Sequence, residues 1–216
     1  MKQGIKAIAK GIKSSGSKGQ PDLAYNSSYL LLQTGLQCLK DSYQNNDRYN
    51  EVIAVVNMSL AIELALTALV MLDTGKQTYK HKHDLLQIYS KCISPQIQKE
   101  LNKKYVEIHN DPKNSKLPKR KFIRRTFECA LQSDDFDIID SESVSQFLDI
   151  HNNAFAKWRF IYEPGEDKIE FNFDFRAALT FYEAVALTMV DIIKGFYEKH
   201  NLPFDNVVKL KYGIEL

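Results

Sequence analysis

The chain has 216 residues, of which 44% are hydrophobic and 26% are charged, and both shares are ordinary for a globular protein. These values exclude a collagen-like, fibrous or wholly disordered chain. The formal net charge of +2 excludes a polycation that binds nucleic acid through its overall charge alone. Three cysteines without a CxxC pair are typical of a reducing compartment, so we expect a cytoplasmic protein.

Residues 1–21 form a basic N-terminal arm that contains five lysines and no acidic residue. Ile5, Ile8 and Ile12 would share one face of a helix in this arm, an arrangement that suits contact with anionic lipid or RNA. The arm ends in a stretch rich in serine and glycine, which instead favours a flexible, solvated segment. We prefer the second interpretation.

Two long helices are predicted next, at about residues 23–43 and at Arg48–Asp73, where Gly75 is a typical helix stop. Residues 52–72 are long and apolar enough to cross a membrane. Glu63 lies at the middle of this run, and a carboxylate there costs a few kcal/mol in a lone bilayer helix. We therefore predict a buried core helix and no membrane span.

The rest of the chain is predicted to complete an all-α bundle of four long helices with short helices inserted between them. The short helices are expected at residues 84–91, from Pro95 onward and at 119–131, and the remaining long helices at 142–162 and 175–200. The bundle then covers residues 22–200, and residues 201–216 form a C-terminal tail.

Residues 168–175 alternate apolar and polar side chains, which is the pattern of a β-strand. No partner strand is evident, and a single strand does not make a sheet. The segment is therefore either one short strand or an extended lead-in to the last helix.

Two oppositely charged segments lie in the second half of the chain. Residues 99–125 contain ten basic and three acidic residues, and residues 134–149 contain six acidic and no basic residues. Such segments can steer polyanions, pair across a dimer, or simply be solvated connectors. The candidate nucleic-acid-binding residues come from the basic segment: Lys119, Arg120, Lys121, Arg124 and Arg125.

Sequence patterns for P-loops, dinucleotide-binding loops, nucleophile elbows and metalloproteases are absent. Residues 81–84 include two histidines and an aspartate, but no second cluster is present to complete a metal site. We therefore expect neither a metal nor a cofactor.

A buried polar cluster is the main candidate for chemistry. Glu63 lies in an otherwise apolar helix, and a buried carboxylate is tolerated only when it is neutral or paired with a cation. Arg159, flanked by aromatic residues, is its predicted partner. His83 and Tyr162 are predicted to complete the cluster, which either fixes the helix register or forms a functional site.

The order of these parts resembles the HEPN (higher eukaryotes and prokaryotes nucleotide-binding) superfamily. The parts are an apolar helix with an internal acid and a glycine stop, a His83-Asp84-Leu85 helix start, and a late helix that ends in Trp158–Glu163. The resemblance covers about residues 23–200. It implies an all-α bundle, often dimeric, of a kind common in toxin–antitoxin, phage-defence and RNA-processing systems.

Active members of that superfamily are metal-independent ribonucleases in which an arginine is followed, after four to six residues, by a histidine. Every arginine of this sequence fails that test, and the positions reached from Arg159 are Pro164, Gly165 and Glu166. Acid–base attack by a ribose hydroxyl is best served by histidine. The resemblance therefore implies a non-catalytic homodimeric module that binds RNA, a nucleotide or a cognate protein.

Two alternatives stay open. In the first, the chain is an active metal-independent endoribonuclease toxin in which a histidine from elsewhere, His83 or His151, stands beside Arg159. In the second, it is a scaffold subunit with no role in nucleic-acid binding.

Overall fold

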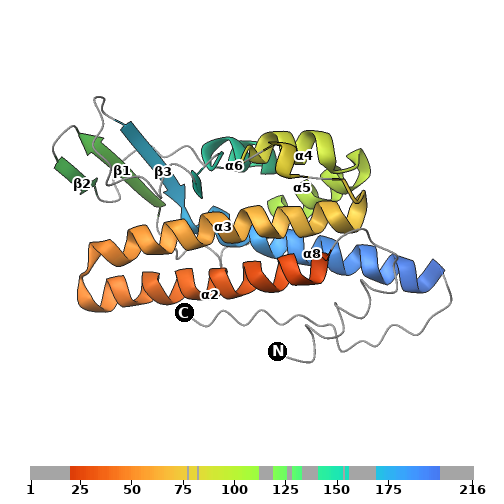
Figure 1. The fold of residues 1–216 in the computed structure, drawn as a ribbon, viewed down its shortest axis with the longest axis horizontal. Coiled ribbons are helices and arrows are strands. Elements are labelled where there is room, and N and C mark those ends of the chain that lie inside the picture. The colour runs from red at the N-terminus through yellow and green to blue at the C-terminus, as the bar shows by residue number, and fades with distance from the viewer. Residues whose placement is uncertain are drawn as a thin grey trace.

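The computed structural model describes residues 20–76, 78–81, 83–111, 119–125, 128–132, 141–152, 154–155 and 169–199. The predicted arm and C-terminal tail lie almost entirely outside these ranges. The described residues form a helical bundle with a small sheet at one end (Figure 1). The elements are α2 (Pro21–Asn45), α3 (Arg48–Asp73), the 3-10 turn η1 (Tyr79–His81), α4 (Leu85–Cys92), α5 (Pro95–His109), β1 (Lys119–Arg125), β2 (Glu128–Gln132), α6 (Val144–Ile150), β3 (Ile169–Asp174) and α8 (Phe175–Lys199).

The all-α bundle predicted from the sequence is confirmed. α2 and α3 form an antiparallel pair joined by Asn46, whose φ of 53° is left-handed, and by Asp47, whose side chain accepts a hydrogen bond from the backbone of Tyr49. α3 ends at Asp73, and Gly75 follows as the expected stop, with a φ of 66° and its N–H bonded to the carbonyl of Val70.

The two helices approach closely at Gly35. A Cβ at this position would lie 2.6 Å from Cγ of Met58 and 3.1 Å from the carbonyl oxygen of Ala54. A residue without a side chain is therefore needed where α2 crosses α3.

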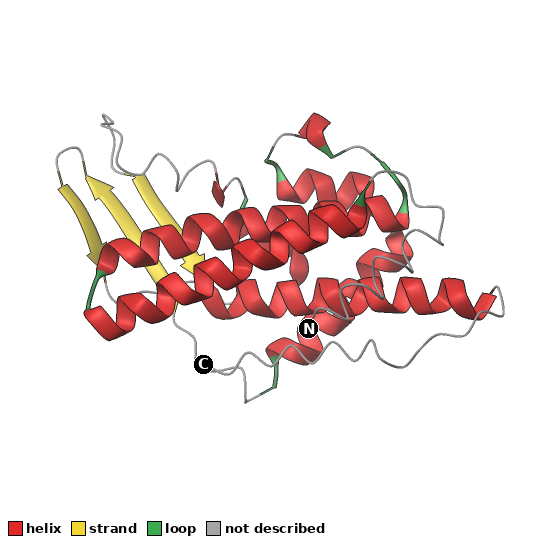
Figure 2. Cartoon of the chain, turned by 60° about the horizontal axis from the view of Figure 1, so that its bottom comes forward, coloured by secondary structure: helices red, strands yellow, loops and turns green. Residues whose placement is uncertain are grey.

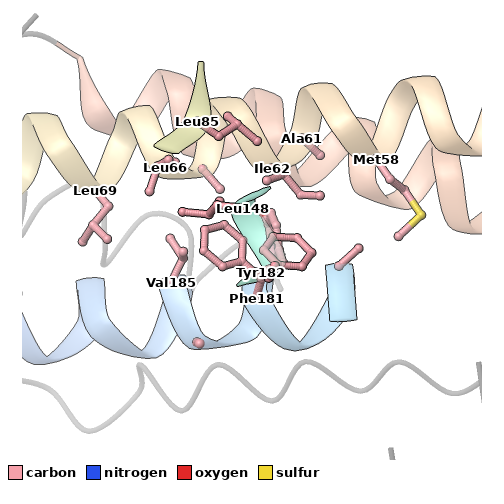
Figure 3. Close-up of a cluster of buried hydrophobic side chains, with 14 of the residues drawn as sticks. Met58, Ala61, Ile62, Leu66, Leu69, Leu85, Leu148, Phe181, Tyr182 and Val185 are labelled. Atoms are coloured by element: carbon pink, nitrogen blue, oxygen red, sulfur yellow. The ribbon is translucent and has the colours of Figure 1, made fainter. Parts of the chain in front are cut away.

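α3 is the central helix and packs against both α2 and α8. Figure 3 shows Ile62, Leu66 and Leu69 of α3 facing Phe181 and Val185 of α8. A helix that is buried on most sides has an almost uniformly apolar sequence, as α3 does. Within the described part of the chain, Tyr49–Asp73 is the one helix long and apolar enough to cross a membrane, and 61% of its most apolar stretch is buried in the fold. The absence of a membrane span stays a prediction.

The sheet corrects the expectation that residues 119–131 are helical. β1 pairs antiparallel with β2 on one side and with β3 on the other, at the end of the bundle that Figures 1 and 2 both show. Residues 168–175 thus include a true strand, and its partner is the basic segment. The local sequence pattern did not predict β1, because β1 has no regular apolar alternation. Its strand geometry depends on pairing with β3, which lies about 50 positions away in the chain.

The predicted helix at 142–162 is interrupted. α6 ends at Ile150, and His151 and Asn152 form a turn before residues 154–155 resume helical geometry. In this turn the N–H groups of Asn152 and Ala154 bond to carbonyls three residues back rather than four. The side chains of His151 and Asn152 bind distant parts of the fold, and this tertiary demand overrides the helical periodicity.

Candidate functional site

Glu63 and His83 are in direct contact. Nδ1 of His83 lies 2.8 Å from Oε2 of Glu63, and the two side chains are 39% and 17% exposed, respectively. Glu63 lies midway along α3, and His83 immediately precedes Asp84, the N-cap of α4. Two members of the predicted cluster are therefore neighbours, although 20 positions separate them in the chain.

The contact orients the imidazole ring of His83. Since Glu63 occupies Nδ1, any proton exchange with a ligand falls to Nε2. The ring of Phe155 packs against the same imidazole, with 5.5 Å between ring centroids and 57° between planes. A carboxylate on one ring nitrogen and an aromatic ring beside it hold a partly exposed histidine in one orientation, as a general acid or base requires.

Asp84 and Asn152 organise the backbone next to His83. One oxygen of Asp84 accepts the Gln87 N–H at 3.0 Å, and Oδ1 of Asn152 accepts the Leu85 N–H at 2.9 Å. Burial acts to raise the pKa of Asp84, but hydrogen bonds from Gln87 and Asn152 and the charge of Lys91 together hold that pKa below its usual value. Asp84 is therefore an ionised cap at neutral pH.

A small hollow lies beside the Glu63–His83 pair. Its empty volume is about 210 Å³ with open solvent included. This volume counts all space between atoms, and no enclosed space for even one water molecule remains, so the hollow is a shallow depression that a ligand group can touch but not enter. Its lining residues are Ser59, Ile62, Glu63, His83, Leu85, His151, Ala154 and Phe155.

His151 also lines the hollow, but its side chain is fully buried. Nδ1 donates to the carbonyl of Phe147 at 2.8 Å, and Nε2 accepts the N–H of Asp174 at 3.1 Å. Burial lowers the pKa of His151 to about 4, against the opposing hydrogen bond to Phe147. With both nitrogens bonded inside the fold, His151 is a neutral structural residue and is not available for acid–base chemistry.

The five predicted nucleic-acid-binding residues all lie on β1, the central strand of the sheet: Lys119, Arg120, Lys121, Arg124 and Arg125. The register pairs Lys119 with Asp174 and Arg120 with Phe173 of β3. Phe173 in turn lies edge-on to His151, with 4.8 Å between ring centroids. The beginning of the basic strand is therefore next to the part of β3 that contacts a wall of the hollow.

Arg159 and Tyr162 lie outside the described residues, so the Glu63–Arg159 pair stays a prediction. Sequence reasoning missed Asn152, whose local signal is the polar His-Asn-Asn run inside a helical pattern. Within the described ranges, no group of three or more His, Cys, Asp or Glu residues could hold a metal ion.

Comparisons of this chain with models of protein families, with curated proteins and with solved structures found no match.

Proposed function

We propose that this chain is a HEPN-like helical bundle that binds RNA across β1 and the hollow beside Glu63 and His83. The observation that carries the proposal is the β-sheet register, which supports a position for the first residues of β1 beside Phe173, whose buried ring contacts His151 in the wall of the hollow. Basic side chains of β1 at this end of the fold would neutralise phosphates, and this supplies most of the affinity in sequence-independent binding.

The aromatic lining of the hollow favours single-stranded RNA. The hollow is too shallow to enclose a nucleotide, so a base or ribose that projects from a strand would lie against its surface. Phe155 lines this space, and aromatic rings beside basic surfaces are the usual platforms for unpaired bases. Duplex RNA would not present its bases in this way.

Binding of a fluorescent single-stranded RNA, measured by anisotropy across a salt series, tests the proposal. We expect the triple variant Lys121→Gln, Arg124→Gln, Arg125→Gln to bind about tenfold or more weakly at about 0.1 M salt. The slope of log K against log salt should fall by about 2, because each lost contact with a single strand contributes about 0.7.

The matched control is Lys40→Gln, Lys99→Gln, Lys103→Gln, which removes the same charge from exposed positions on α2 and α5. We expect it to retain wild-type affinity. Equal losses in both variants would show that only net charge matters. The absence of any salt-dependent binding by the wild type would favour the scaffold function instead.

A second candidate function is metal-independent cleavage of the bound RNA, and the Glu63–His83 hydrogen bond favours it. In this reaction Nε2 of His83 would accept the proton of a ribose 2′-hydroxyl as that oxygen attacks the adjacent phosphorus. The 5′ oxygen of the next nucleotide would leave with a proton from a second group. Glu63 would stabilise the imidazolium that forms.

Incubation of RNA with purified protein in EDTA tests for cleavage. We expect His83→Gln to abolish the reaction and Glu63→Gln to slow it, while DNA of the same sequence stays intact because it lacks the attacking hydroxyl. Cleavage that survives His83→Gln would exclude this mechanism. RNA left intact by the wild type would leave the binding function alone.

We also propose a cytoplasmic homodimer with a cognate protein partner in a bacterial or phage defence or toxin–antitoxin system. This context rests on the sequence resemblance and on the unpaired cysteine pattern. Light scattering of the purified protein measures the mass of the assembly directly.

A further inference from the structure

We infer that Asn152 is a positioning residue that holds His83 against Glu63. The inference rests on the function proposed for His83 and adds to it a residue whose side chain forms hydrogen bonds to Leu85 and Asp84 rather than to Glu63 or His83. Oδ1 of Asn152 accepts the N–H of Leu85 at 2.9 Å, and Nδ2 donates to Oδ1 of Asp84 at 3.3 Å. Both bonds reach the two residues that directly follow His83 in the chain.

These bonds satisfy groups that the helix itself cannot. The first backbone N–H groups of an α-helix have no partner within the helix. In α4, Asp84 satisfies the N–H of Gln87, and Asn152 satisfies the N–H of Leu85 from 67 positions away. Because α4 has only eight residues and isolated helices of that length are unstable, its first turn depends on such bonds.

The side chain of His83 is attached immediately before this turn, so any movement of the turn moves the imidazole. Glu63 holds the ring on one side, and Phe155 packs against it within the segment that carries Asn152. That segment is anchored in turn by His151, whose side chain is buried and bonded at both nitrogens. A rigid path therefore runs from His151 through Asn152 to the start of α4.

The amide of Asn152 suits this role better than other polar groups. One end accepts from a backbone N–H and the other donates to the carboxylate of Asp84. Aspartate could keep the first bond but would place a second carboxylate beside Asp84, and alanine would lose both bonds.

The tautomer of His83 is measured from the NMR chemical shifts of its two imidazole nitrogens. The measurement uses the full-length protein at a pH high enough for neutral imidazole. In the wild type we expect Nδ1 to carry the proton, because it faces Glu63. In Asn152→Ala we expect the resonances to shift toward the Nε2–H tautomer that free imidazole side chains prefer. A change of tautomer distinguishes positioning from a general loss of stability.

Asn102→Ala is the matched control. Oδ1 of Asn102 accepts the N–H of Val144, the first residue of α6, at 3.0 Å. The control therefore removes the same kind of bond from another short helix. We expect both alanine variants to lower the melting temperature by a similar amount, and only Asn152→Ala to change the tautomer of His83.

An unchanged tautomer in Asn152→Ala, or an equal change in Asn102→Ala, would overturn the inference. If Asn152→Ala does not fold, Asn152→Asp replaces it, and there we expect a smaller shift toward the Nε2–H form, because the bond to Leu85 is kept but a second carboxylate stands beside Asp84. A tautomer identical to that of the wild type in the aspartate variant would contradict the assignment. None of these outcomes depends on RNA, so a chain that binds no RNA but shows the tautomer change would refute the proposed function alone.

Discussion

Two histidines line the same hollow, and the surroundings of each decide what it can do. His151 is fully buried, with one nitrogen on a backbone carbonyl and the other on a backbone N–H. His83 is 39% exposed, with one nitrogen on a carboxylate. The first histidine therefore joins α6 to the β3–α8 junction, and the second presents a partly exposed imidazole to solvent. Proximity to a hollow alone does not identify a functional histidine.

Among the predictions that test this contrast between the two histidines, the largest expected effect is a loss of stability in the variant His151→Ala. The substitution removes the side-chain partner of the Asp174 N–H and one of the two bonds that the Phe147 carbonyl accepts, the other of which comes from the backbone N–H of residue 151. It also removes a ring that packs 4.3 Å from Phe147 and 4.8 Å from Phe173, measured between centroids. We expect the free energy of unfolding in urea to fall by about 3–5 kcal/mol. A loss below 1 kcal/mol, as for a surface residue, would contradict the structural role.

The next effect is a dependence of stability on pH that comes from His151. Burial lowers its pKa in the folded state to about 4, from an ordinary value of 6.5. The unfolded chain therefore binds more protons between these values, so the free energy of unfolding falls as the pH decreases from 6.5 toward 4. The full difference between the two pKa values of His151 corresponds to a loss of about 3 kcal/mol in the free energy of unfolding.

Urea unfolding at pH 7.5 and pH 5 measures this dependence. His151→Gln cannot titrate, and we expect the stability of that variant to change less than the stability of the wild type between the two pH values. An identical change in both proteins would assign the pH dependence to carboxylates instead.

The smallest loss of stability is expected for substitutions of the Glu63–His83 pair, for which a function is proposed. Glu63→Gln and His83→Gln break a pair in which one member is well exposed, so water and salt screen the attraction. We expect each variant to lose about 1 kcal/mol or less in urea unfolding. A loss equal to that of His151→Ala would show that the pair is a structural element of the core.

The helices were predictable wherever local chemistry decides. α3 has an apolar sequence, and its predicted bounds at Arg48 and Asp73 and its stop at Gly75 match the structure. Pro95 begins α5 as expected, although the hydroxyl of Ser94 donates to Asp73 rather than capping its own helix. Glu63 was recognisable because a carboxylate in an apolar helix requires a partner.

The errors arose where a distant segment decides. Residues 119–125 gained a strand geometry only through pairing with β3, and α6 stopped at Ile150 because His151 and Asn152 bind β3 and α4. The periodicity of apolar residues in a local stretch of sequence does not predict such long-range hydrogen bonds. His83 was correctly predicted to join Glu63 in one cluster, but the direct bond between the two side chains depends on the loop between α3 and α4, which sets where His83 lies.

By itself, the sequence determined the helical class, the central apolar helix and the carboxylate within it, because burial of apolar surface and helix capping act over short stretches of chain. Only the tertiary structure decided the geometry of the Glu63–His83 contact, the burial of His151 in its neutral form, and the strand geometry of the basic segment. These outcomes depend on desolvation and on hydrogen bonds between residues far apart in the chain, and both exist only after the elements have packed.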